Sequence, residues 1–167
     1  MAATSDLLLE RLRRLEAREA IRDAIHSYAM AGDRGNDASM VRKLFTANGV
    51  FEAKGMGRFE GLDNIVAGLA AIARDTVVWA FHAASGPLIR LSEDGLRARV
   101  FWWIWVPASL KGPDGAVAPH WGAGQYNATM VESQGQWKFE QVLLETRLLT
   151  PFEGPWTPVD GPFQWLT

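Results

Sequence analysis

The stretch that decides the fold is Arg97-Ala98-Arg99-Val100-Phe101-Trp102-Trp103-Ile104-Trp105-Val106. It begins as an alternation of polar and apolar residues and then becomes apolar on both faces. A strand that is covered on both faces, in a curled sheet with helices on one side, has this pattern. We therefore expect residues 95–106 to form a central strand of a curved sheet.

Further segments of strand character and three helical segments surround this strand. The other long strand segments are residues 76–91, 120–132 and 136–149, and a short hairpin is expected at residues 50–53 and 57–60. Helical spacing predicts helices over residues 5–32, 38–45 and 65–74, with Gly32 ending the first and Asp63 capping the third. This order predicts an α+β fold, a cone-shaped α+β barrel with three N-terminal helices packed on a strongly curved, mostly antiparallel sheet.

Composition narrows the classes of function. The 167 residues fit a single domain, 1–167, in which residues from about 150 to 167 are expected to form a C-terminal extension covering the body. A net charge of −2 gives no basic field for nucleic acid or an anionic membrane, so neither is an expected partner. The absence of cysteine excludes disulfides and thiolate chemistry. No apolar run suggests a signal peptide or a membrane span, so a cytoplasmic protein is expected.

The chain is rich in large aromatic residues, with eight Trp and eight Phe. One interpretation is a small core filled with large side chains, and the other is a pocket for a flat apolar or aromatic ligand. Under the second interpretation we expect the substrate-binding residues to be Trp79, Phe101, Trp103, Trp105, His120 and Tyr126.

Four segments, in order along nearly the whole chain, carry a resemblance to a known superfamily. They are Leu15–Asp23 followed by Tyr28-x4-Asp33, Phe51 to Gly61, Phe81-His82-Ala83-Ala84-Ser85, and Gly135 to Phe139 with Leu149 to Phe152. The chain resembles the SnoaL-like branch of the nuclear-transport-factor-2-like superfamily. That resemblance implies the cone-shaped fold with one open mouth, which is a small-molecule pocket.

Within the superfamily the chain most resembles cofactor-free lyases, namely hexachlorocyclohexane dehydrochlorinase, bile-acid 7α-dehydratase, scytalone dehydratase and diarylpropane lyases. The resemblance implies a dyad of Asp33 and His82, with Tyr28 and Arg147 as further catalytic residues. The dehydrochlorinase has Lys at the position of Tyr28, which disfavours halide elimination. An acidic residue of the bile-acid enzyme has no counterpart in the stretch 102–105, which favours an aromatic substrate.

The residues themselves are suited to acid–base chemistry. A neutral imidazole removes a proton near pH 7 best when a carboxylate holds its second nitrogen, and Tyr and Arg can stabilise charge that develops on oxygen. Each residue also has a structural interpretation. Asp33 precedes turn-forming residues, His82 and Tyr28 could be core residues, Arg147 could form a surface ion pair with Glu145, and His120 could simply be exposed.

We therefore expect a cofactor-independent lyase, a dehydratase or a retro-aldol (deformylating) enzyme, acting on a small aromatic or alicyclic alcohol. No metal is expected, because the chain lacks His-x-His and HExxH spacing, and no phosphate-binding loop is present. The alternatives are an isomerase or polyketide-cyclase-type enzyme, and a non-catalytic small-molecule binding module. Because relatives of this fold are commonly dimers or trimers, a homo-oligomer is expected.

Overall fold

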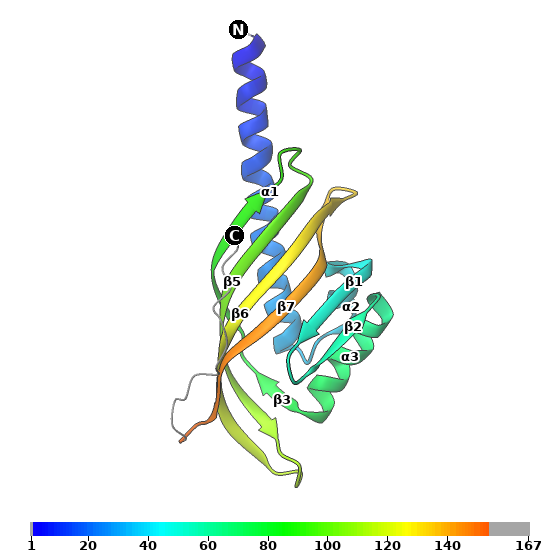
Figure 1. The fold of residues 1–167 in the computed structure, drawn as a ribbon, viewed down its shortest axis with the longest axis vertical. Coiled ribbons are helices and arrows are strands. Elements are labelled where there is room, and N and C mark those ends of the chain that lie inside the picture. Colours follow the sequence, from blue (N-terminus) through cyan, green and yellow to red (C-terminus); the bar gives the residue numbers. More distant parts are fainter. Residues whose placement is uncertain (1, 154–167) are drawn as a thin grey trace.

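The computed structural model describes residues 2–153 (Figure 1). The helices are α1 (Ala2–Asp33), α2 (Ala38–Leu44) and α3 (Leu62–Asp75). The strands are β1 (Phe45–Ala53), β2 (Gly57–Glu60), β3 (Val77–Ala80), β4 (Ala83–Leu91), β5 (Arg97–Lys111), β6 (Val117–Ser133) and β7 (Gln136–Pro151). Within the described part of the chain, no helix has the length and apolar character needed to cross a membrane.

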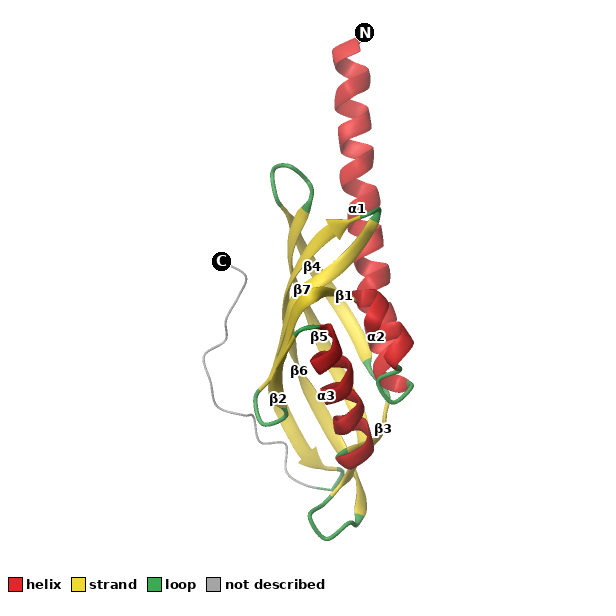
Figure 2. Ribbon diagram, turned by 90° about the vertical axis from the view of Figure 1, so that its right-hand side faces the viewer, coloured by secondary structure: helices red, strands yellow, loops and turns green. Residues whose placement is uncertain are grey.

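The seven strands form one sheet in the order β2-β1-β7-β6-β5-β3, with β4 also paired to β5. Every pairing is antiparallel except that of β1 with β7. The long strands β5, β6 and β7 curl into a half-barrel, and the three helices pack against its concave face (Figure 2). The α+β fold expected from the sequence, with three helices on a strongly curved and mostly antiparallel sheet, is confirmed.

The core lies between the concave face of the sheet and the helices. It includes Ile21, Ile25, Val41, Ile65, Trp102, Met130, Phe139 and Val142, all of them buried. The helical spacing of Ile21 and Ile25 places both on one face of α1, which is how the second half of this helix reaches the sheet. The first half of α1 projects beyond the sheet (Figure 1).

Several expected boundaries are wrong for identifiable reasons. The expected loop over residues 107–119 shrinks to 112–116, because Pro107 and Pro119 lie within paired strands opposite Trp121 and Ser109. A proline fits a strand where its missing N–H is not needed. The expected strand over residues 76–91 breaks between Ala80 and Ala83, and α3 is capped by Gly61 rather than by Asp63.

The expected C-terminal extension lies largely outside the described residues. Its first residues, Thr150 and Pro151, still belong to β7, and residues 154–167 are beyond the described range.

Candidate active site

Asp33 and His82 meet although 49 positions separate them in the sequence. Asp33 is the last residue of α1, and His82 lies in the break between β3 and β4. The break is fixed on both sides, because the Phe81 N–H donates to the Pro107 carbonyl at 3.1 Å and Ala83 pairs with Trp105. His82 is therefore positioned by backbone contacts to β5 rather than by a continuous strand of its own.

The carboxylate of Asp33 holds both the backbone and the ring of His82. Its Oδ1 accepts from the backbone N–H of His82 at 2.7 Å and lies 2.8 Å from ring Nδ1. A carboxylate can only accept, so Nδ1 carries a proton, and in the neutral imidazole the free lone pair is on Nε2. The two side chains are 20% and 29% exposed, so the pair lies at the rim of the interior, within reach of a ligand.

Gly32 lets the imidazole approach the helix. A Cβ added at Gly32 would lie 2.8 Å from Cε1 and 3.0 Å from Nδ1 of His82, closer than carbon atoms normally approach. The expectation that Gly32 ends the helix is wrong, since α1 continues to Asp33. Because Gly32 has no side chain, the imidazole of His82 can pack directly against the helix backbone.

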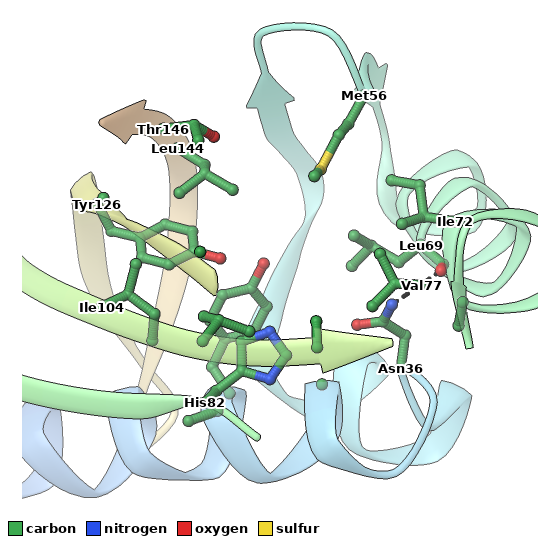
Figure 3. A pocket seen from close by; sticks show the side chains of 18 of the residues that line it. Asn36, Met56, Leu69, Ile72, Val77, His82, Ile104, Tyr126, Leu144 and Thr146 are labelled. Carbon is green, nitrogen blue, oxygen red and sulfur yellow. Dashed lines mark hydrogen bonds between the residues drawn. The ribbon is translucent and has the colours of Figure 1, made fainter. Parts of the chain in front are cut away.

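A cavity of about 130 Å³ opens beside the dyad, between the concave face of the sheet, α1 and α3. Its walls are mostly aliphatic and include Met56, Leu69, Ile72, Val77, Ile104, Val106, Leu110, Leu144 and Leu149. The polar side chains in the lining are His82, Tyr28, Tyr126, Asn36 and Thr146 (Figure 3). Within residues 2–153, no Asp, Glu, Lys or Arg lines this cavity.

Tyr28 and Tyr126 form a buried hydroxyl pair on the inner wall. Their rings meet edge to face with centroids 5.8 Å apart, and the two hydroxyls are hydrogen-bonded. Burial raises the pKa of Tyr28 well above its usual value and that of Tyr126 to about 12. Both phenols are therefore protonated at neutral pH. Because each hydroxyl has one proton, one proton remains for a ligand after the mutual bond.

Of the aromatic residues expected to bind substrate, Tyr126 lines the cavity, whereas Phe101, Trp103 and Trp105 do not. Successive side chains of a strand point to opposite faces. In β5 the residues that line the cavity are Trp102, Ile104, Val106, Ala108 and Leu110. The expected aromatic lining is thus displaced by one residue along the strand, and the stretch that is apolar on both faces concealed the difference.

The remaining expected site residues also lie outside the cavity lining. Trp79 in β3 is 55% exposed, and the His120 Nδ1 contacts the Ala118 carbonyl at 3.0 Å. Arg147 lies where the register of β7 against β6 shifts, between the pairs Gly124–Thr146 and Ala123–Leu148. The neighbouring Thr146, not Arg147, faces the cavity.

Asn36, Thr146, Trp102 and Gly32 line the cavity but are not among the site residues expected from the sequence. Asn36 lies among the turn-forming residues that follow Asp33, and Thr146 directly precedes Arg147. The sequence does carry a signal for Gly32, because a glycine inside a helix normally has a packing reason. In the described part of the chain, no group of three or more His, Asp or Glu side chains is arranged to hold a metal ion.

Comparisons with known proteins agree with this architecture. A family model described as a SnoaL-like domain matches residues 13–142. A hexachlorocyclohexane dehydrochlorinase (LinA type 2) superposes with a TM-score of 0.78 at 16% identity, covering 91% of this chain and 99% of the other. A candidate scytalone dehydratase from Novosphingobium aromaticivorans gives 0.74 at 20% identity, with 91% and 98% covered.

A third solved structure, a candidate aromatic ring hydroxylase from Novosphingobium aromaticivorans, gives a TM-score of 0.70 at 21% identity, with 82% and 94% covered. Comparison with curated protein sequences finds no match. At these identities the structural matches show a shared fold, and a shared fold hosts different chemistries.

Proposed function

This chain belongs to the SnoaL-like domain family, and on that premise we propose that it is a cofactor-independent lyase acting on a small aromatic or alicyclic alcohol. The observation that carries the proposal is the oriented dyad, in which Asp33 Oδ1 lies 2.8 Å from Nδ1 of His82 at the edge of an apolar cavity. Its relatives of the same fold include a dehydrochlorinase and a candidate dehydratase.

In the proposed mechanism His82 is the general base. In a dehydration, Nε2 removes a proton from the carbon next to the one that bears the hydroxyl, and the hydroxyl leaves as water. In a retro-aldol cleavage of a β-hydroxy carbonyl compound, Nε2 removes the hydroxyl proton and the bond from the α carbon to the hydroxymethyl carbon breaks with release of formaldehyde. The electron pair left on the α carbon then takes the proton back from the imidazolium. The Asp33 carboxylate stabilises the imidazolium formed in either case, and a positioned base contributes roughly 10²–10⁴-fold in rate.

The tyrosine pair supplies the acid side of the reaction. Tyr28 and Tyr126 keep their protons at neutral pH because burial raises both pKa values. A hydroxyl directed into the cavity can donate to a departing hydroxyl or to a developing oxyanion. We assign the stabilisation of charge on oxygen to this pair and not to Arg147, which is not among the residues lining the cavity.

The cavity supports a small, uncharged substrate. A volume of about 130 Å³ is close to the roughly 150 Å³ of an apolar cavity known to hold benzene. Without a charged side chain in the described lining, a carboxylate or ammonium group on the buried part of the substrate would be left unpaired, which is costly. We therefore propose a neutral compound with one ring.

Mass spectrometry of purified protein with neutral aromatic and alicyclic alcohols tests the proposal. Loss of water identifies a dehydratase and loss of formaldehyde a retro-aldol lyase. A product of unchanged mass would instead identify an isomerase or cyclase, in which His82 returns the proton that it removes. Ligand-dependent melting shifts without any product would leave only the binding module.

Variants of the dyad test the mechanism itself. We expect His82→Ala and Asp33→Asn to lower kcat by about 10²–10⁴-fold with little change in ligand affinity. His26→Ala is the matched control, because His26 is exposed on α1 and absent from the cavity lining. Full turnover by either dyad variant would refute the mechanism.

We also propose that the chain forms a homo-oligomer, a dimer or a trimer. The projecting half of α1 exposes leucines to an unusual degree, from 50% to 66%, at Leu7, Leu8, Leu9, Leu12 and Leu15. An isolated helical segment of this length is marginal in water, so a partner surface that covers these leucines would stabilise it. Light scattering should give a dimer or trimer for the native chain and a smaller mass for Leu8→Ser/Leu12→Ser, whereas a native monomer would refute the proposal.

A further inference from the structure

Asn36 occupies a rigid turn at the edge of the cavity, three residues after Asp33. Its φ of 58° lies in the left-handed region, which Asn tolerates better than most residues. The turn is held by the Asp37 N–H, which donates to the Ala31 carbonyl at 3.1 Å. The Asp37 carboxylate in turn accepts from the Met40 N–H at 2.9 Å and caps α2. The backbone of Asn36 is thus fixed on both sides.

The side-chain amide of Asn36 has only one sensible orientation. Nδ2 lies 2.9 Å from the carbonyl oxygen of Leu69 in α3. A carbonyl oxygen only accepts, so the nitrogen of Asn36 must face it and Oδ1 must face the other way. Figure 3 shows this oxygen directed into the cavity, on the side formed by Leu69, Ile72 and Val77.

The oxygen is an acceptor that lacks a protein donor within residues 2–153, since the one hydrogen bond of the Asn36 side chain is made by Nδ2. Its surroundings are aliphatic, and an amide oxygen in an apolar environment gains from any donor that reaches it. The opposite wall of the cavity carries Tyr126 and Thr146 (Figure 3). A ligand in the cavity therefore meets a fixed acceptor on the helical side.

We propose that Oδ1 of Asn36 is a specificity subsite that accepts a hydrogen bond from a hydroxyl group of the substrate. The substrate class becomes a neutral single-ring compound with two hydroxyl groups, one at Asn36 and one at the dyad. The assignment of the second hydroxyl rests on the proposed function. The acceptor subsite itself rests on the orientation of the Asn36 amide and on the uncharged lining.

Calorimetric titration with resorcinol and toluene tests the subsite without requiring turnover. Both are single rings, but only resorcinol donates hydrogen bonds. We expect wild type to bind resorcinol more tightly than toluene, and Asn36→Gly to weaken resorcinol by roughly 2- to 10-fold while leaving toluene unchanged. Glycine adopts a positive φ without strain, so this substitution removes the amide and keeps the turn.

Two results would overturn the subsite. One is wild-type protein that does not prefer resorcinol to toluene, and the other is an Asn36→Gly variant that weakens both probes equally or neither. Asp33→Asn separates this inference from the proposed function. It should lower kcat by about 10²–10⁴-fold and leave the dependence of resorcinol binding on Asn36 intact, whereas full turnover with an intact subsite would refute the dyad mechanism alone.

Discussion

The two faces of β5 are similar in composition and different in use. On the concave face Trp102 is 1% exposed, stacks on Tyr126 with ring centroids 4.8 Å apart, and borders the cavity. On the convex face the next residue, Trp103, packs edge to face on Phe101 at 4.9 Å. Both faces carry large aromatic rings, but the cavity beside His82 lies on the concave face.

Polar groups follow the same division. On the convex face, the carboxylate of Glu145 accepts from the amides of Gln125 and Asn127, so these polar side chains are bonded to one another and not directed to a cavity. On the concave face, His82 and Asn36 each use one polar atom for the protein and direct another to the cavity. A ligand site is therefore distinguished from a packed core by side chains that bond to the protein through one polar atom and direct another into a cavity. A high content of aromatic residues does not distinguish the two.

The largest effect should come from one methyl group added on the concave side. Gly32→Ala would place a carbon 2.8 Å from Cε1 of His82, so the ring must shift from the position in which Nδ1 meets Asp33. We expect kcat to fall by about 10²-fold or more, as for loss of the base itself. The measurement is kcat together with the melting temperature.

The melting temperature separates this effect from unfolding. Alanine is a better helix former than glycine by about 1 kcal/mol, which offsets part of the clash, so Gly32→Ala should remain folded. Wild-type activity in Gly32→Ala would show that the ring does not need its present position, and the contrast between the two faces would lose its catalytic meaning.

Sequence reasoning paired Asp33 with His82, which the structure brings into contact, but the aromatic residues of β5 that it placed in the pocket lie outside the cavity lining. The resemblance identified Asp33 and His82, and the structure joins them through one carboxylate oxygen. Strand register decides which aromatic residues of β5 face the concave side. The sequence does not reveal that register here, because the run is apolar on both faces and shows no alternation. Asn36 was similarly hidden, because an asparagine after a glycine is typical of any turn.

A matched pair of substitutions tests which face of β5 binds the ligand. We expect an effect of intermediate size on ligand affinity. Ile104→Phe on the concave face fills part of the cavity and should weaken binding of a single-ring ligand about tenfold or more, with stability little changed. Trp105→Phe, one residue further on the convex face, should leave affinity unchanged. The smaller ring makes less contact with Trp121, so this substitution should lower Tm by about 2–4 °C. The opposite pattern would place the ligand on the convex face.

The smallest effect concerns the two tyrosines, which are the only ones in the chain and both lie on the concave side. Burial raises the pKa of Tyr126 to about 12 and that of Tyr28 well above the usual value. Ultraviolet titration of the native protein should therefore show no phenolate near pH 10, where an unfolded tyrosine is half ionised at a pKa of about 10.

The raised pKa values of the two tyrosines also determine how stability changes with pH. Above about pH 10 the unfolded chain releases its phenolic protons while the folded chain retains them, so the free energy of unfolding should fall as pH rises toward 12. Tyr126→Phe leaves one tyrosine, and the remaining signal should still appear only at high pH because Tyr28 is packed between Phe45 and Phe139. A native phenol that ionises near pH 10 would mean that the hydroxyl pair is open to water. Water would then reach the concave face as it reaches the surface, and the tyrosines could not serve as the buried proton donors that the proposed reaction requires.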